Sequence, residues 1–182
     1  NKMNTTQIRD AIGAGRWFTA SKEKLTKEVD DYINDAKAKL PAIDGHIVGC
    51  ISPHAGFLYS GPTAGYNFAA IQRDAEQHGK PDVVFIIGFS HSRSFNHAAI
   101  MDGKAIRTPI GVTEIDLEAI KVFKEGRSYL KCDYNPHFGE HSAENQIPFV
   151  QRALPGVKVV VVLVGCHKGD VLKQVAEGLE DV

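Results

Sequence analysis

Three continuous runs of apolar residues, widely spaced along the chain, limit the fold more than any other feature of this sequence. They are residues 47–51 (Ile-Val-Gly-Cys-Ile), 83–87 (Val-Val-Phe-Ile-Ile) and 157–164 (Val-Lys-Val-Val-Val-Val-Leu-Val). Apolar runs that do not alternate with polar residues are typical of strands buried on both faces of a parallel sheet. We therefore predict that the three runs form central strands with helices on each side.

Helical patterns lie between or after these runs, and this alternation favours a three-layer α/β domain with a mostly parallel or mixed sheet. Ser21 is a good N-cap and Pro41 a stop for a first helix over 21–40. Further helices are expected at 62–77, 116–125, 143–154 and 169–180. Pro62 fits the first turn of its helix, capped by Ser60, whereas Pro148 is expected to kink its own. Residues 97–101 and 105–108 are expected to pair as a short hairpin.

The chain has 182 residues and a formal net charge of −1, which suits one domain over 1–182 and offers no basic stripe for nucleic acid. No apolar run reaches the length of about 20 residues that a membrane span needs. Cys50, Cys132 and Cys166 are an odd number without CxxC spacing. We therefore predict no disulfide framework or structural zinc site, and a reducing, cytoplasmic location.

Ionisable or metal-binding residues follow the end of each predicted strand. His54 follows the first, His91 and Arg93 follow the second, and Cys166 and His167 follow the third. Because the carboxyl ends of adjacent parallel strands share one edge of a sheet, we expect His54 and His91 to converge. Two neutral imidazoles with a carboxylate or thiolate make a site for a divalent transition metal.

A fourth polar cluster, residues 135–146, precedes the helix expected at 143–154 and contains Glu140, His141 and Glu144. Either glutamate is a candidate to orient the second ring nitrogen of a ligating histidine. Trp17 is interpreted as an anchor onto the core. The remaining histidines of interest are interpreted as loop or surface residues: His46, His78 and His137.

Other chemistries find less support in the sequence. Residues 88–92 (Gly-Phe-Ser-His-Ser) lack the second glycine of a nucleophile elbow, which disfavours a serine hydrolase. Neither a GxGxxG nor a phosphate-binding GxxxxGK[ST] motif occurs, so nucleotide use is not predicted. Arg93 is open to two interpretations, as a group that binds an anionic substrate or as a solvated loop residue.

Four motifs, in this order, resemble the Memo family, the mediator of ErbB2-driven cell motility and its prokaryotic relatives. They are 15–20 (Gly-Arg-Trp-Phe-Thr-Ala), 52–56 (Ser-Pro-His-Ala-Gly) with Tyr59 and Gly61, 85–91 (Phe-Ile-Ile-Gly-Phe-Ser-His), and 140–149 (Glu-His-Ser-Ala-Glu-Asn-Gln-Ile-Pro-Phe). The resemblance extends from about residue 8 to the last residue. It implies a fold similar to that of the class III non-heme iron extradiol dioxygenases.

The resemblance also implies a function. It places metal ligands at His54 and His91, catalytic residues at Glu140 and His141, and iron or copper as the cofactor of a possible oxidoreductase of unknown substrate. The alternative is a non-catalytic module that binds anionic or phosphotyrosine peptides. Candidate substrate-binding residues are Arg93, Tyr59 and Glu144.

Family members extend further, so the resemblance implies that this chain lacks the C-terminal third with the cysteine that is the third metal ligand. Two histidines alone would hold a metal weakly, unless Cys166, His167 or a carboxylate substitutes for that ligand. We also expect a sheet edge that a second copy or a partner chain would cover. A small molecule or phosphopeptide is the expected ligand, and a radical-SAM protein the expected partner if the chain is prokaryotic.

Overall fold

The computed structural model describes residues 2–182 and contains two mixed sheets. The larger has the order β2-β7-β3-β6, with bounds Val83–Phe89, Lys158–Val164, Ala98–Met101 and Leu130–Cys132. In it β2 runs parallel to β7, while β3 runs antiparallel to β7 and parallel to β6. The smaller has the order β1-β4-β5, with bounds Ile8–Asp10, Ala105–Arg107 and Val112–Glu114. A single bridge between Ile115 and Val159 joins the smaller sheet to β7.

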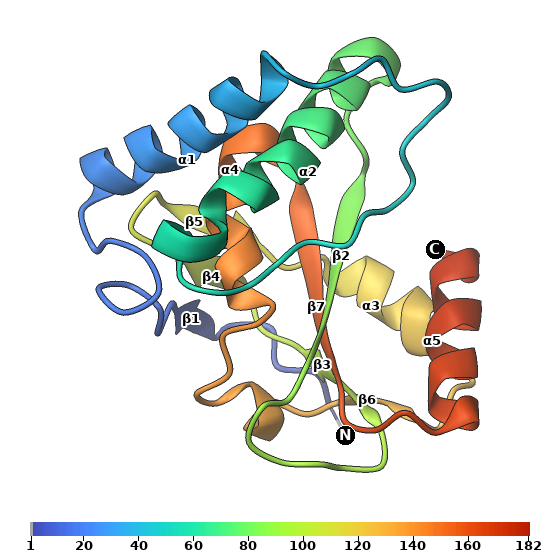
Figure 1. Cartoon of the computed structure of the whole chain (residues 1–182). Coiled ribbons are helices and arrows are strands. Elements are labelled where there is room, and N and C mark those ends of the chain that lie inside the picture. The colour runs from blue at the N-terminus through green and yellow to red at the C-terminus, as the bar shows by residue number, and fades with distance from the viewer. Residues whose placement is uncertain (1) are drawn as a thin grey trace.

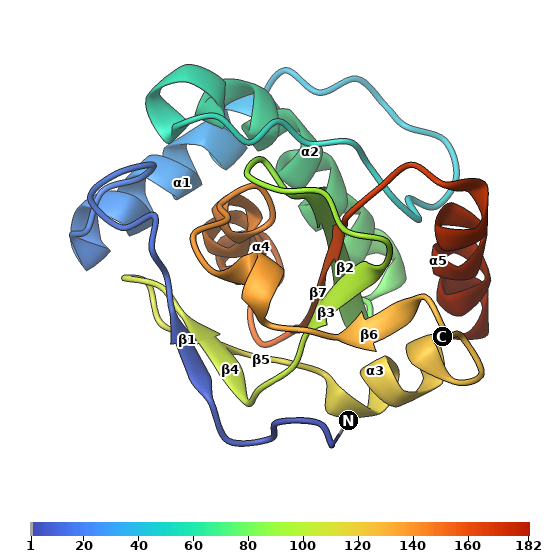
Figure 2. The same cartoon turned by 90° about the horizontal axis from the view of Figure 1, so that it is seen from below.

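Two groups of helices cover the larger sheet, one on each face (Figure 1). The first group is α1 (Lys22–Lys37), α2 (Phe57–His78) and α4 (Ile147–Ala153). The second is α3 (Leu117–Lys124) and α5 (Gly169–Asp181). Figure 2 shows β7 between α4 on one side and α5 on the other. The three-layer α/β prediction with a mixed sheet is therefore confirmed.

The strand predictions at 83–87 and 157–164 are confirmed by β2 and β7. Because both faces of β7 are covered by helices, every residue from Val159 to Leu163 is buried. The N-cap of α1 is also as predicted, since the Ser21 hydroxyl accepts a hydrogen bond from the amide of Lys24. None of the helices in residues 2–182 combines the length and the apolar character that a transmembrane helix needs.

Residues 47–51 do not form the predicted strand. They run as irregular chain, with 96% of Val48 and 97% of Ile51 exposed. A backbone group at each end of the segment bonds to a side chain of α2 and not to a strand: the Ile47 amide donates to Asp74, and the Ile51 carbonyl accepts from Asn67. An apolar cleft of about 490 Å³ lies between this segment and the edge strand β2.

Three further predictions about local structure were wrong. Helix α2 begins at Phe57, so Pro62 lies inside it rather than in its first turn. Strands β3 and β4 belong to different sheets and do not pair as a hairpin. The helix expected over 143–154 is instead a 3-10 turn, η2 (Glu144–Gln146), followed by α4. Pro148 therefore occupies the first turn of α4, where its missing N–H causes no kink.

Candidate metal centre

Three separate segments bring three histidines together. His54 lies in the irregular chain just before α2, His91 in the loop after β2, and His141 between the 3-10 turn η1 (Asn135–His137) and η2. Each offers one ring nitrogen, and these atoms all lie within 4.8 Å of one another. His54 and His91 thus converge as predicted, and a third imidazole joins them.

The imidazoles of His54 and His91 face each other through their Nε2 atoms, which are 3.3 Å apart. At this distance either one Nε2–H donates to the other nitrogen or both lone pairs face a shared cation. The ring of His141 stacks on that of His91 with centroids 4.6 Å apart. The three rings therefore border one small volume.

Glu140 fixes the orientation of His91. Its carboxylate accepts one hydrogen bond from the His91 amide at 2.7 Å and another from His91 Nδ1 at 2.8 Å. The amides of His141 and Ser142 also donate to it, each at 2.8 Å. Because the ionised carboxylate only accepts, Nδ1 of a neutral His91 carries the proton. The Nε2 lone pair is then directed at the other imidazoles, as in metal sites whose ligands are oriented by a carboxylate.

The same contacts determine the charge of Glu140. Burial acts to raise its pKa, but the amides of His91, Ser142 and His141 and the His91 ring outweigh burial and lower that pKa to about 2. Glu140 is therefore an anion at neutral pH and holds no proton to donate. Its geometry is that of a positioning residue, and the catalytic role predicted for it remains a prediction.

Burial lowers the pKa of both His54 and His141, because the charged ring is less well solvated there. The neighbouring imidazoles act in the same direction, while Glu140 partly opposes the effect. Both rings are therefore biased toward the neutral form. Neutral imidazole is the form that binds a metal ion, so the group is ready to act as a set of ligands.

His141 is the metal-binding candidate that the sequence did not reveal, since it was expected to be catalytic. The group formed by His54, His91 and His141 contains neither Cys166 nor His167, two of the candidates to substitute for the third ligand. The available signal was the position of His141 directly after Glu140. Trp17 packs against the core, as predicted, and its indole also stacks on His141 with centroids 3.8 Å apart.

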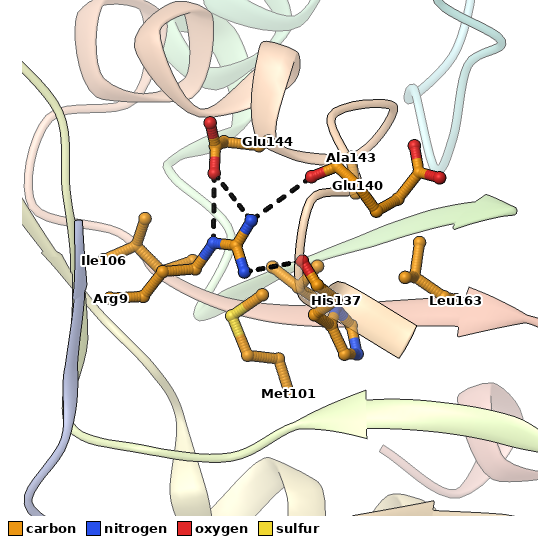
Figure 3. A pocket seen from close by; sticks show the side chains of 9 residues that line it. Arg9, Met101, Ile106, His137, Glu140, Ala143, Glu144 and Leu163 are labelled. Atoms are coloured by element: carbon orange, nitrogen blue, oxygen red, sulfur yellow. Dashed lines mark hydrogen bonds and ion pairs between the residues drawn. The ribbon is translucent and has the colours of Figure 1, made fainter. Parts of the chain in front are cut away.

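A buried arginine holds the loop that carries Glu140 and His141 (Figure 3). Arg9 from β1 donates to the backbone carbonyls of His137 at 2.8 Å and Glu140 at 3.2 Å. Its guanidinium also pairs with Glu144 at 2.9 Å, and the two side chains are only 4% and 3% exposed. The adjacent cavity of about 10 Å³ has room for no more than about one water molecule.

The same loop also holds the segment that carries His54. The Asn145 side-chain amide donates to the His54 carbonyl at 2.9 Å, and that of Gln146 donates to the Pro53 carbonyl at 3.1 Å. Residues 140–146 thus supply one imidazole, orient the second through Glu140 and hold the third by its backbone. This segment organises the whole centre.

The three residues predicted to bind substrate lie in different environments. Tyr59 and Arg93 are exposed, on the first turn of α2 and in the loop after β2. Glu144 is buried, and its second oxygen accepts from the Gly13 amide at 2.8 Å. Glu144 thus has a structural role in the loop, and substrate binding by all three residues remains a prediction.

Comparison with known proteins shows which protein family the chain resembles. The model of a family described as Memo, Memo-like protein, matches residues 9–182. A MEMO1 family protein of Pyrobaculum aerophilum is 30% identical over 86% of this chain and 56% of its own length. One of Aeropyrum pernix is 33% identical over 89% of this chain and 58% of its own. The Caenorhabditis elegans protein memo-1 homolog is 31% identical over 88% of this chain and 44% of its own.

The chain therefore spans about half the length of these relatives. The family match covers almost all of residues 2–182, including the segments that carry the three imidazoles, Glu140 and Arg9. On this match, together with the fold, the chain belongs to the Memo family.

Proposed function

We propose that this protein is a metal-dependent oxidoreductase whose iron or copper ion is held by His54, His91 and His141. The observation that carries the proposal is the grouping of three ring nitrogens within 4.8 Å. The Glu140 carboxylate also supports the proposal, because it accepts a hydrogen bond from Nδ1 of His91 and so leaves the lone pair of Nε2 to face a cation.

The donor set fits such an ion. Imidazole suits iron and copper as well as zinc, and three protein ligands leave a coordination position open for a substrate or dioxygen. When bound there, the ion would polarise a substrate oxygen or exchange electrons. We favour iron or copper because the motifs of the chain resemble a family that is associated with these two metals, whereas the donor set by itself suits zinc as well.

The protein contributes orientation and shielding. Glu140 holds the His91 ring through Nδ1, the nitrogen opposite the one that faces His54. Trp17 covers one face of His141 and keeps water from it. The ring of His91 is partly exposed, at 39%, and so provides the side from which a substrate would enter.

Elemental analysis tests this proposal directly. The chain is purified without a histidine tag, reconstituted with Fe²⁺ or Cu²⁺ and dialysed. We expect the metal bound by the wild type to be lost in His54→Ala, His91→Ala and His141→Ala variants. His167→Ala, which removes an exposed histidine after β7, is the matched control and keeps it. Equal metal content in all four variants and the wild type would contradict the proposed site.

The alternative is a module that binds anionic or phosphotyrosine peptides. It is favoured by Arg93, an exposed basic residue two positions after His91 in the same loop. Calorimetry with a phosphotyrosine peptide and its unphosphorylated counterpart distinguishes the two functions. Heat with the phosphopeptide alone that is lost in Arg93→Ala and independent of added metal would favour the binding module over the oxidoreductase.

A further inference from the structure

A second group of potential metal ligands lies at the other end of α2. Asp74 and His78 are four residues apart on the last turns of that helix, and His46 approaches from the irregular segment that follows α1. One donor atom from each lies within 4.8 Å of the other two. At 1.5 Å per residue, Asp74 lies roughly 25 Å along the helix from the end near His54, so the two groups are separate.

The Asp74 carboxylate lies between the two imidazoles. His46 Nδ1 is 2.8 Å from one carboxylate oxygen, and His78 Nδ1 is 3.1 Å from the other. The two rings meet edge to face with centroids 5.1 Å apart. The Asp74 side chain is only 10% exposed, whereas those of His46 and His78 are 58% and 43% exposed. The group therefore consists of a buried carboxylate and two imidazoles that are open to solvent.

The backbone holds this carboxylate in place. The Ile47 amide donates to Asp74 Oδ1 at 3.0 Å, and it thereby ties the irregular segment to the helix. Burial acts to raise the pKa of Asp74, but the Ile47 amide and the imidazoles of His78 and His46 lower it further than burial raises it. Asp74 is thus a carboxylate anion with a fixed orientation.

We propose that His46, Asp74 and His78 form a second metal site, which takes a divalent transition cation of the zinc type. Two imidazoles and one carboxylate are the protein ligands that Zn²⁺ takes in open sites, where water fills the fourth position. Mg²⁺ and Ca²⁺ fit less well, because they prefer a shell of oxygen atoms. A cation here would bind the Nδ1 atoms of the two imidazoles and a carboxylate oxygen, and the single ring proton of each neutral imidazole would then lie on Nε2.

Such a cation would cross-link a long irregular segment to α2. Residues 38–56 contain neither a helix nor a strand, and His54 of the first group lies near their end. Connections of this length without secondary structure are uncommon in compact domains. A metal held by His46, Asp74 and His78 would fix the middle of this segment, because it adds a ligand bond from His46 to the hydrogen bonds that Ile47 and Ile51 already make with α2.

The test begins from a variant in which the first group is removed, His54→Ala/His91→Ala/His141→Ala. Co²⁺ and Zn²⁺ are titrated into the full chain, followed by the visible absorption of Co²⁺ and by calorimetry. We expect one ion per chain in this variant. Adding His46→Ala/His78→Ala should abolish the binding, and adding His167→Ala should leave it unchanged. Asp74→Asn, which keeps the shape but removes the charge, should weaken it by at least about tenfold.

Binding that is absent from the starting variant, or equal with and without His46 and His78, would overturn the second site and leave a hydrogen-bonded His-Asp-His cluster. If the starting variant does not fold by circular dichroism, the comparison is made in the otherwise unchanged chain. There the expected result is a fall from two Zn²⁺ ions per chain to one in His46→Ala/His78→Ala. An unchanged number would again overturn the proposal. The first centre is assayed separately, so the failure of one site is distinguishable from the failure of the other.

Discussion

The indole ring of Trp17 lies flat against the imidazole of His141, with ring centroids 3.8 Å apart and planes inclined by 4°. Trp17 is the only tryptophan of the chain, so its fluorescence arises beside one member of the proposed centre. This contact links the segment before α1 to the loop that organises the centre. It also provides an optical signal for metal binding.

We expect Cu²⁺ to quench the fluorescence of Trp17 when it binds to the three imidazoles, because the ion then lies one ring away from the indole. His141→Ala should abolish this quenching at low Cu²⁺ concentration. His46→Ala/His78→Ala, which alters only the group at the far end of α2, is the control and should leave it intact. Quenching that persists unchanged in His141→Ala would show that the ion lies elsewhere.

Replacing Glu140 with Gln should weaken metal binding by about 10- to 100-fold, the usual effect of removing a partner that orients a ligating histidine. The amide lacks the charge that keeps the proton on His91 Nδ1. Asp133→Asn is the matched control, since it alters the carboxylate that pairs with His97 at 2.9 Å outside the centre. Calorimetry with Fe²⁺ or Cu²⁺ measures the affinity, and circular dichroism checks the fold. Equal affinities for the two variants would argue against the orienting role.

Arg9→Met should lower the free energy of unfolding by about 3–5 kcal/mol, because Glu144 is then left as a buried charge without its partner. Arg107→Met is the control, since it removes an exposed pair with Asp10 on the neighbouring strands and should cost at most about 1 kcal/mol. Urea unfolding measures both. The double variant Arg9→Met/Glu144→Gln should recover part of the loss, and a double variant no more stable than the single one would contradict this account.

His137 should make the protein less stable as the pH falls below neutrality. Burial lowers its pKa from 6.5 to about 4, and its Nε2–H donates to the carbonyl of Ala99 at 2.9 Å. Between these two values the unfolded chain binds the proton more readily than the folded one. The stability is therefore complete above about pH 6.5 and declines toward pH 4, by on the order of 3 kcal/mol in total.

Urea unfolding across this pH range measures the decline, and His137→Gln should make it shallower, since the amide can still donate to Ala99 but does not titrate. The decline that remains belongs to His54 and His141, whose pKa values are also lowered. The contribution of Glu140 is separated by pH, because its lowered pKa removes stability only as the pH falls from about 4.5 toward 2. A variant with the same slope as the wild type between pH 6.5 and 4 would show that His137 is not the responsible group.

The sequence predicted the parts of the fold that depend on burial pattern. Strands β2 and β7 were predicted correctly because a continuous apolar run is typical of a strand that is buried on both faces. Residues 47–51 show the same pattern, yet their amide and carbonyl groups bond to Asp74 and Asn67 of α2. An apolar pattern shows that a segment is suited to a buried strand. It does not show whether the backbone of that segment pairs with a neighbouring strand or bonds to side chains, as at Ile47 and Ile51.

The centre was predicted in part for a similar reason. His54 and His91 were expected to converge because strand ends share an edge, but only His91 follows a strand. His54 lies in irregular chain and is held there by side chains of residues 145 and 146. The third imidazole was missed because His141 is brought in by a loop whose position depends on Arg9, a residue of β1 far away in the chain. His46, His78 and His137 were interpreted as loop or surface residues, which was wrong for His137 because its side chain is buried against the carbonyl of Ala99. His46 and His78 are exposed, but their common contact with Asp74 could not be read from spacing.

The hydrogen bonds of residues 140–146 have a consequence for the order in which parts of the molecule fold. Glu140 bonds to a residue 49 positions earlier, and Asn145 bonds to one 91 positions earlier. Contacts of such long range form only after the entropy of closing the intervening chain has been lost. We therefore expect the three imidazoles to come together late in folding, so that a metal would bind to the folded protein and would not nucleate it.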